Sequence, residues 1–256
     1  MGRTKQKLKS GETAFGAWNM IPHPAVAEML AGEDFDWICV DMEHTSHDFQ
    51  TLENICRAVN KSGKDLLVRL PACDDVVAKK ALDLGANGII VPCVNSPEEA
   101  RRAVAIAKYP PDGIRGVSLA RCTDFGRNSG GYFKAHNENV LVVIMLEHID
   151  AVKNVAAILS VPGIDAAFIG PYDLSSSMGL AGQLDHPDVL AAQKTLLDAC
   201  IAHGVPPGFH IVPNEPPQVA ARIKAGFRFI ALGLDTGFII EGSRAMLAGV
   251  KKGVTE

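Results

Sequence analysis

The amino-acid sequence predicts an α/β protein built as a single (β/α)8 TIM barrel over residues 1–256. Short apolar or β-branched runs alternate eight times with amphipathic stretches, and about 250 residues is the usual length of eight such units. A doubly wound open sheet is the alternative. It is disfavoured because no G-x-G-x-x-G pattern follows the first expected strand.

The strands and helices are expected from these runs in turn. Several amphipathic stretches end in glycine, the usual residue at a helix C-terminus. The sequence SPEE, from residue 96, opens one helix with a serine cap, a proline in the first turn and carboxylates near the positive end of the helix dipole. The expected strands cover 13–18, 37–41, 65–70, 88–92, 141–146, 166–170, 206–210 and 228–232; the expected helices cover 24–32, 49–63, 75–85, 96–108, 150–160, 187–204 and 217–226.

Composition excludes several classes of partner. The net charge is −4 and no basic stripe is present, so nothing indicates nucleic-acid binding. The basic start of the chain lacks the apolar core of a secretory signal, and no run reaches about 18 apolar residues, so we expect no membrane span. The six cysteines are scattered without a C-x-x-C pair, which indicates reduced thiols in a cytoplasmic protein rather than a disulfide or zinc framework.

A glycine- and arginine-rich segment at about 110–138 is expected to be a long loop between the fourth and fifth strands. A loop of this length in a compact domain is more often functional than idle. Its Arg121 and Arg127 either bind a second anionic group on the substrate's partner or are solvated.

Polar side chains recur at the C-terminal ends of the expected strands. This is the end at which (β/α)8 barrels hold their catalytic groups. In strand order these residues are Trp18, Asp41, Glu43, His44, Arg69, Glu147 and Asp173.

Glu147 and Asp173 form a candidate metal site. They are 173 − 147 = 26 residues apart, which is one strand–helix unit, so adjacent strands would place both carboxylates in one mouth. Like charges at that separation need a shared proton or a cation. Two carboxylates, completed by water and substrate, suit Mg²⁺ or Mn²⁺. The alternative for each acid is a helix N-cap or a salt-bridge partner.

Arg69 and His44 are candidates for binding and proton transfer. Arg69 either grips a substrate carboxylate with its guanidinium fork or forms an ion pair with Asp41 or Glu43. His44 is a candidate general base near neutral pH. His47, by contrast, is expected to be a solvated loop histidine.

The stretch at 170–179 is expected to turn from strand to helix. The backbone N–H groups of Tyr172 and Asp173 could hold a substrate carboxylate at the start of that helix. A plain serine-rich N-cap is the alternative for residues 175–177.

These residues carry a family pattern that runs nearly end to end. The chain resembles the HpcH/HpaI aldolase family, the metal-dependent (class II) pyruvate aldolases that include hydroxyoxoheptanedioate and dehydro-deoxy-glucarate aldolases. The GP-x-DLS-x-SMG stretch with an upstream glutamate is specific to that family. The matching segments are FDWICVDMEHTSHDFQTLENICRAV, LLVRLP, LDLGANGIIVPCVNSPEEA, GIRGVSLAR, VPGIDAAFIGPYDLSSSMG and ALGLDTGF.

The resemblance implies roles for five residues. Glu147 and Asp173 match the divalent-metal ligands, for which Mg²⁺, Mn²⁺ or Co²⁺ is expected. Arg69 matches the arginine that binds the keto acid and stabilises the developing enolate oxygen. His44 matches the base that moves the aldol hydroxyl proton. Asp83 matches a carboxylate that raises the basicity of that histidine.

The resemblance also implies a fold and an assembly. Family members have the (β/α)8 fold and are commonly hexamers, trimers of dimers, so we expect a homo-oligomer. Tyr172 and Asp173 match the backbone site for the substrate carboxylate. Trp18 and Asp41 lie where family members place supporting pocket residues.

Two positions depart from the family pattern. The aldolases usually carry a substrate-contacting glutamine where this chain has Met145, and a small polar residue where it has His148. A thioether cannot make the hydrogen bonds of an amide. These departures bear on the substrate and the reaction, while the metal ligands are retained.

The expected activity is reversible retro-aldol cleavage of a 4-hydroxy-2-keto acid to pyruvate, or a related 2-keto acid, and an aldehyde. The alternative of a different class is a carbon–carbon condensing enzyme that uses oxaloacetate and an acyl thioester, or a decarboxylative condensation. A Schiff-base aldolase would need a lysine at a strand end, and none is convincing. A binding protein without catalysis is disfavoured because His44, Arg69, Glu147 and Asp173 are all present.

Overall fold

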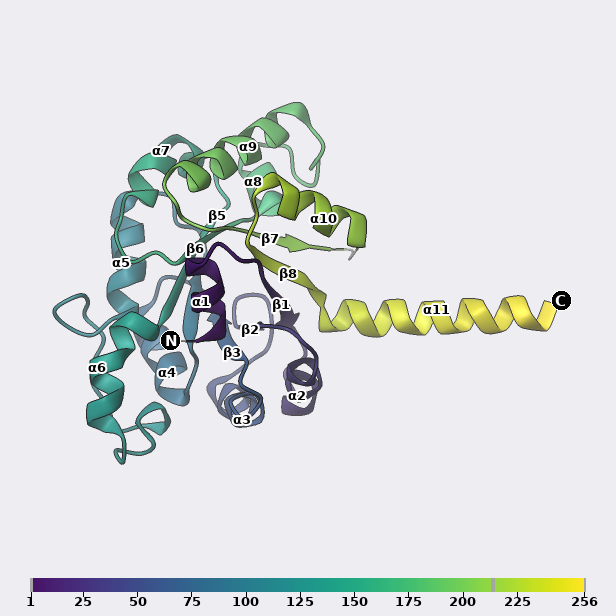
Figure 1. Cartoon of the computed structure of the whole chain (residues 1–256). Coiled ribbons are helices and arrows are strands. Elements are labelled where there is room, and N and C mark those ends of the chain that lie inside the picture. The colour runs from purple at the N-terminus through teal and green to yellow at the C-terminus, as the bar shows by residue number, and fades with distance from the viewer. Residues whose placement is uncertain (1, 213–214, 256) are drawn as a thin grey trace.

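The computed structural model describes residues 2–212 and 215–255 and confirms the barrel. Parallel strands pair in chain order, and β8 closes the ring on β1 (Figure 1). Each strand lies within two residues of its expected range, because a short buried apolar run is a local signal. The strands are β1 (Ala14–Asn19), β2 (Trp37–Asp41), β3 (Asp65–Arg69), β4 (Gly88–Val91), β5 (Leu141–Leu146), β6 (Ala166–Ile169), β7 (Pro207–Ile211) and β8 (Phe229–Leu234).

The helices of the expected stretches surround this barrel (Figure 1). Short α8 (Pro171–Ser177) follows β6, as the strand-to-helix turn predicted. Helix α1 (Arg3–Lys9) was not expected; its buried Lys5 donates to the carbonyl of Val140 at 2.7 Å and pairs with Asp165 at the start of β6. The expected helices are α2 (Pro24–Gly32), α3 (Phe49–Val59), α4 (Asp75–Leu84), α5 (Pro97–Ala107), α7 (Ile149–Leu159), α9 (Pro187–Ala202) and α10 (Pro216–Ala225).

The segment 110–138 is not one long loop, so that expectation was wrong for its second half. It contains the 3-10 helix η1 (Arg121–Thr123), and helix α6 (Ser129–Asn139) begins within it. The first turn of α6 includes two glycines, and the helix carries no apolar period that would predict it. Its stability therefore depends on tertiary contacts.

A buried arginine supplies those contacts at the N-terminal end of the barrel. Arg115 Nη2 lies 2.7 Å from Asp83 Oδ1, and Nη1 donates to the hydroxyl of Tyr132 on α6 at 3.1 Å. The guanidinium also stacks on Tyr109, and His136 of α6 packs beside it. This cluster joins α6 to the end of α4.

The interior of the barrel and the layer outside it are filled by alternate residues of each strand. On β5, Val143 and Met145 belong to the inner cluster, whereas Val142, Ile144 and Leu146 pack against the helices. Large rings fill the inside: Trp37 stacks on Phe229 with centroids 4.3 Å apart. Residues two positions beyond an inner strand residue therefore point into the mouth of the barrel.

Helix α11 (Asp235–Thr255) runs out from the barrel, whereas the other helices pack around it (Figure 1). Its large apolar residues Ile239, Ile240, Met246, Leu247 and Val250 are exposed. Within residues 2–212 and 215–255, no helix combines the length and apolar character needed to cross a membrane.

We expect Gly16→Ala to destabilise the fold by about 1–3 kcal/mol, the usual effect of overpacking a core. Gly16 is an inner residue of β1, and a Cβ atom there would overlap the fully buried indole of Trp37. Denaturant unfolding monitored by circular dichroism measures the change. Gly32→Ala, at the last residue of α2, is the matched control, because an added Cβ atom there would meet no atom from elsewhere in the structure within 4 Å; it should be neutral or slightly stabilising. Equal losses in both variants would contradict this account of the core.

Candidate active site

A pocket of about 120 Å³ opens at the C-terminal ends of the strands. The two-residue alternation described above directs Trp18, Arg69 and Glu147 to the inside of the barrel, where they meet. Residues from β1, β3, β5, β6 and β7 contribute. The lining is Trp18, Arg69, Met145, Glu147, Phe168, Ile169, Gly170, Pro171, Tyr172, Asp173, His210 and Val212.

Arg69 is held rigidly at one side of this pocket. Its Nε donates to Asp41 Oδ1 at 3.0 Å, its Nη2 donates to Asp41 Oδ2, and its Nη1 lies 3.0 Å from Glu43 Oε2. The guanidinium also lies over the indole of Trp18, with Cζ 5.1 Å from the centroid. Arg69 therefore forms the ion pairs with Asp41 and Glu43 that the sequence offered as one alternative. These pairs occupy three of the five guanidinium N–H groups and leave two for a ligand.

Asp41 is fully buried and orders the loop after β2. It accepts hydrogen bonds from the backbone N–H groups of Glu43 and His44. Burial acts to raise the pKa of Asp41, but the hydrogen bonds and positive charge of Arg69 outweigh it and hold the pKa below its usual range. Asp41 is therefore ionised at neutral pH and fixes the orientation of Arg69.

Glu147 is 3% exposed and lies directly after β5. Its Oε1 accepts the backbone N–H of Cys93 at 2.8 Å, and Cys93 has a left-handed backbone with φ 53°. On the other side, a Cβ atom at Gly170 would come within 2.6 Å of Oε2, so glycine permits the end of β6 to approach this oxygen. Burial raises the pKa of Glu147, and the neighbouring charges of Asp173 and Glu43 raise it further.

The donor set fits a hard divalent cation. Glu147 and Asp173 line one pocket, and a buried carboxylate beside other carboxylates is stabilised by a nearby positive ion. In the described part of the chain, no group of three or more His, Cys, Asp or Glu side chains could hold a metal by itself. Two carboxylate ligands with the remaining positions left to water and substrate are what Mg²⁺ commonly takes.

The histidines after β2 lie in different environments. His44 is at the rim with its side chain 62% exposed, and its Nε2 lies 3.8 Å from Glu43 Oε2. His47 is buried, and its Nδ1 lies 2.9 Å from the carbonyl of Asp41, so its expected solvated role was wrong. Nothing in the sequence around His47 signals this, because the contact depends on how the loop folds back.

Asp83 does not lie beside His44 within this chain. Helix α4 runs from the C-terminal end of the barrel back to the N-terminal end, and Asp83 is near its finish. There its carboxylate is bound by Arg115. The structure therefore places Asp83 in the cluster that anchors α6, at the opposite end from the pocket.

Tyr172 and Asp173 occupy the first turn of α8. The residue before this turn, Gly170, has no side chain to cap it, and Pro171 has no N–H to donate. Both side chains are solvent-exposed at the pocket edge, and Ser175 is buried instead, with its hydroxyl donating to the carbonyl of Tyr172 at 2.7 Å.

The two departures from the family pattern have different surroundings. Met145 is buried in the pocket wall, two residues before Glu147. His148 caps α7, where its Nδ1 accepts the N–H of Asp150 at 3.1 Å. Only Met145 therefore bears on what the pocket binds.

The two loop arginines are far from this pocket. Arg121 donates to the carbonyl of Leu84 at the end of α4, and Arg127 pairs with Asp124. Within one chain, neither contributes to the mouth of the barrel.

Phe168 and His210 are among the pocket residues that sequence reasoning missed. Phe168 is an inner residue of β6 and was classified only as strand. His210 ends an expected strand and stacks on Trp18 with centroids 4.8 Å apart; burial lowers its pKa to about 4, so it is neutral at pH 7. Its position at a strand end was the signal that could have identified it.

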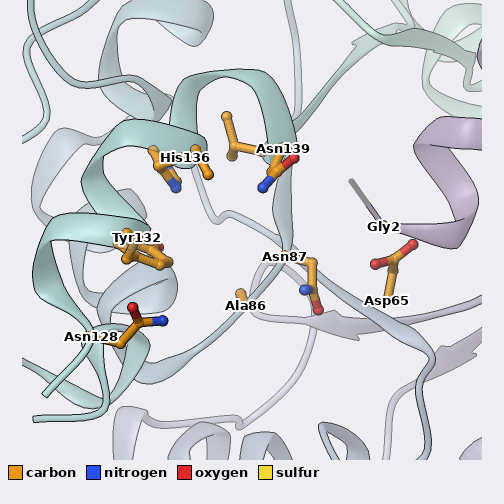
Figure 2. A pocket seen from close by; sticks show the side chains of 11 residues that line it. Gly2, Asp65, Ala86, Asn87, Asn128, Tyr132, His136 and Asn139 are labelled. Carbon is orange, nitrogen blue, oxygen red and sulfur yellow. The ribbon is translucent and has the colours of Figure 1, made fainter.

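A larger pocket of about 310 Å³ lies at the opposite end of the barrel. Figure 2 shows Asp65, Asn87, Tyr132 and His136 around it. Its acid, Asp65, already accepts the N–H of Thr4 at 2.8 Å. Catalytic groups of (β/α)8 enzymes lie at the C-terminal ends of the strands, so the smaller pocket is the candidate active site.

Comparisons with known proteins identify the family of the chain. The family model described as HpcH/HpaI aldolase/citrate lyase matches residues 15–242. The 4-hydroxy-2-oxo-heptane-1,7-dioate aldolase of Salmonella paratyphi C (strain RKS4594) is 39% identical over 256 residues, which cover 98% of this chain and 96% of the relative. The 2-dehydro-3,6-dideoxy-6-sulfogluconate aldolase of Pseudomonas putida is 37% identical over 245 residues, 95% of each chain.

A solved structure extends the comparison to a different reaction. The crystal structure of the citrate synthase SbnG superposes with a TM-score of 0.87 at 29% identity and covers 98% of both chains. The match over nearly the whole sequence, together with the aldolase relatives, decides the assignment. The chain belongs to the HpcH/HpaI aldolase/citrate lyase family and is a carbon–carbon lyase.

Proposed function

We propose that this enzyme is a divalent-metal-dependent aldolase that cleaves a 4-hydroxy-2-keto acid to pyruvate, or a related 2-keto acid, and an aldehyde. The observation that carries the proposal is the meeting of Arg69 with Glu147 and Asp173 in one pocket. A guanidinium, together with a cation held by two carboxylates, can bind the keto and carboxylate oxygens of an α-keto acid. Whether Mg²⁺, Mn²⁺ or Co²⁺ is used is an outcome of the test below.

Glu147 and Asp173 would hold the cation, which would act as a Lewis acid on the keto oxygen of the substrate. The two free N–H groups of Arg69 stabilise the negative charge that develops on that oxygen during cleavage. Asp41 keeps those donors aimed, because it fixes the guanidinium through two hydrogen bonds. The N–H groups of Tyr172 and Asp173 bind the substrate carboxylate.

His44 removes the proton of the 4-hydroxyl group in the cleavage direction and returns it in condensation. Its exposed position at the rim suits transfer through a water molecule. Trp18, Met145 and Phe168 form an apolar wall that limits the access of water to the carbanion. Because Met145 replaces an amide, this wall offers no hydrogen bond there.

We further propose that the aldehyde half carries an acidic group. The names of both curated relatives describe substrates with a second acid, a carboxylate in one and a sulfonate in the other.

The six cysteines of the chain are free, which supports action in a reducing compartment such as the cytoplasm.

A condensing reaction on oxaloacetate and an acyl thioester is the second candidate. Met145 and the similarity to a citrate synthase favour it. Release of free thiol from acetyl-CoA and oxaloacetate, without pyruvate release from any hydroxy-keto acid, would establish this reaction in place of the aldolase. A Schiff-base route has no candidate lysine, since none lines the pocket among the described residues. Trapping of a pyruvate adduct by borohydride would contradict this exclusion of a Schiff base.

We also propose that the protein is a homo-oligomer, a hexamer arranged as a trimer of dimers. The helix α11 supports this, because it leaves the barrel with an exposed apolar stripe that a second copy could cover. The stripe consists of Ile239, Ile240, Met246, Leu247 and Val250.

The proposed reaction predicts metal-dependent pyruvate release. A screen of 4-hydroxy-2-keto acids with Mg²⁺, Mn²⁺ and Co²⁺ in turn, coupled to lactate dehydrogenase, measures it. EDTA should abolish turnover, and Glu147→Gln should lower kcat/KM by roughly 1,000-fold, as expected for loss of Lewis-acid assistance. Asp150→Asn is the matched control, because Asp150 is a nearby solvent-exposed acid paired with Lys153. Full activity in a rigorously metal-free preparation would refute the mechanism.

The proposed assembly predicts that Ile240→Glu with Leu247→Glu lowers the particle mass measured by light scattering after gel filtration. Both residues are exposed on the apolar stripe of α11, and charge there opposes burial. Ala245→Glu with Ala248→Glu adds the same charge to the other face of the helix and should leave the mass unchanged. A monomeric wild-type protein would rule the assembly out.

A further inference from the structure

A second pocket of about 170 Å³ adjoins the candidate active site. The two pockets share four lining residues: Pro171, Tyr172, His210 and Val212. The second pocket lies between the end of β7 and the helices α9 and α10, which contribute Gln193, Gln218 and Arg222. A ligand long enough to leave the barrel past His210 would enter it.

Among the described residues that line this second pocket, Arg222 is the one arginine, and no salt bridge joins it to a described acid. Its guanidinium stacks on Phe209, with Cζ 4.0 Å from the ring centroid, and approaches Phe227 at 5.6 Å. Among residues 2–212 and 215–255, no hydrogen bond or salt bridge joins the guanidinium of Arg222 to any acceptor, and Asp185, which lines the same pocket, is not paired with it. Burial lowers the pKa of Arg222.

Arg115 shows what a similar arginine looks like when its charge is satisfied. It also stacks on an aromatic ring and is more deeply buried than Arg222, but its Nη2 lies 2.7 Å from the carboxylate of Asp83. Arg222 has no such carboxylate partner among the residues that the structure describes, and it lines a pocket of about 170 Å³. A half-buried guanidinium without an anion is unfavourable, and its planar fork matches a carboxylate or sulfonate.

We propose that Arg222 binds the distal anionic group of the substrate, in a subsite that extends from the catalytic pocket past His210 and Tyr172. This inference rests on the aldolase function proposed above and assigns its acidic aldehyde half to a residue. The 2-keto acid end occupies the pocket of Arg69 and Glu147, and the far carboxylate or sulfonate pairs with Arg222. Neutral His210, stacked on Trp18, forms the wall between the two ends.

The test compares 4-hydroxy-2-oxo-heptane-1,7-dioate with its 7-amide, which keeps the length and loses the distal charge. In the wild type the dioate should have the higher kcat/KM by about 10-fold to 100-fold, the usual contribution of a hydrogen bond to a charged group. Arg222→Met keeps the packing on Phe209 and should remove that preference, mainly through KM, while cleavage of the amide changes less than about twofold. Arg222→Lys, which keeps the charge without the fork, should retain part of the preference.

Lys224→Met is the matched control, because it removes the same charge from an exposed position on the same helix. It should leave the preference intact, which separates direct contact from long-range attraction. Equal losses on both substrates in Arg222→Met, or an unchanged preference, would overturn the subsite.

Calorimetric titration of both ligands into EDTA-treated protein keeps this test separate from the reaction. If the wild type cleaves neither ligand but binds the dioate more tightly than the amide in an Arg222-dependent way, the subsite stands and the aldolase proposal fails. If cleavage occurs but neither binding nor kcat/KM depends on Arg222, the subsite fails and the aldolase proposal stands.

Discussion

The alternation of side chains along the strands of a closed parallel barrel is the constraint on which this molecule depends. Each strand fills the interior with every second residue, so the next residue in that series, beyond the last apolar one, must face the mouth. Met145 is followed in this way by Glu147, Cys39 by Asp41 and Leu67 by Arg69. The same strand register therefore determines both the packing of the inner core and the arrangement of the candidate site. A shift of a strand by one residue would turn its core residues outward and would also remove its charged residue from the mouth of the barrel.

The charges at the mouth divide into a satisfied set and an unsatisfied set. Asp41 is fully buried and would be destabilising alone, but Arg69 meets both of its oxygens. Glu147 is nearly as buried, yet its described partners are only the N–H and thiol of Cys93, and other carboxylates face it. The pairing of Asp41 with Arg69 explains how the guanidinium is positioned. The lack of a described positive partner for Glu147 is the physical reason to expect a cation between Glu147 and Asp173.

The two ends of the barrel use similar chemistry for different purposes. At the N-terminal end, Arg115 and Asp83 neutralise each other and bind α6 to the barrel, so their charges serve stability. At the C-terminal end, Arg69 keeps free donors, and Arg222 is paired with no acid in the described part of the chain. Charge that is left unpaired beside an open pocket is what a binding surface requires, and it separates the functional end from the structural one.

The sequence by itself determined the eight strands, most of the helices and the residues at the strand ends, because apolar period and capping are local properties. Those ends included Trp18, Arg69, Glu147 and Asp173. Only the tertiary structure decided which distant groups meet. Within one chain it placed Asp83 with Arg115 instead of His44, buried His47, made a helix of α6 despite its glycines, and left Arg222 without a described anion beside the pocket. These outcomes depend on contacts between residues far apart in the chain, which no local pattern records.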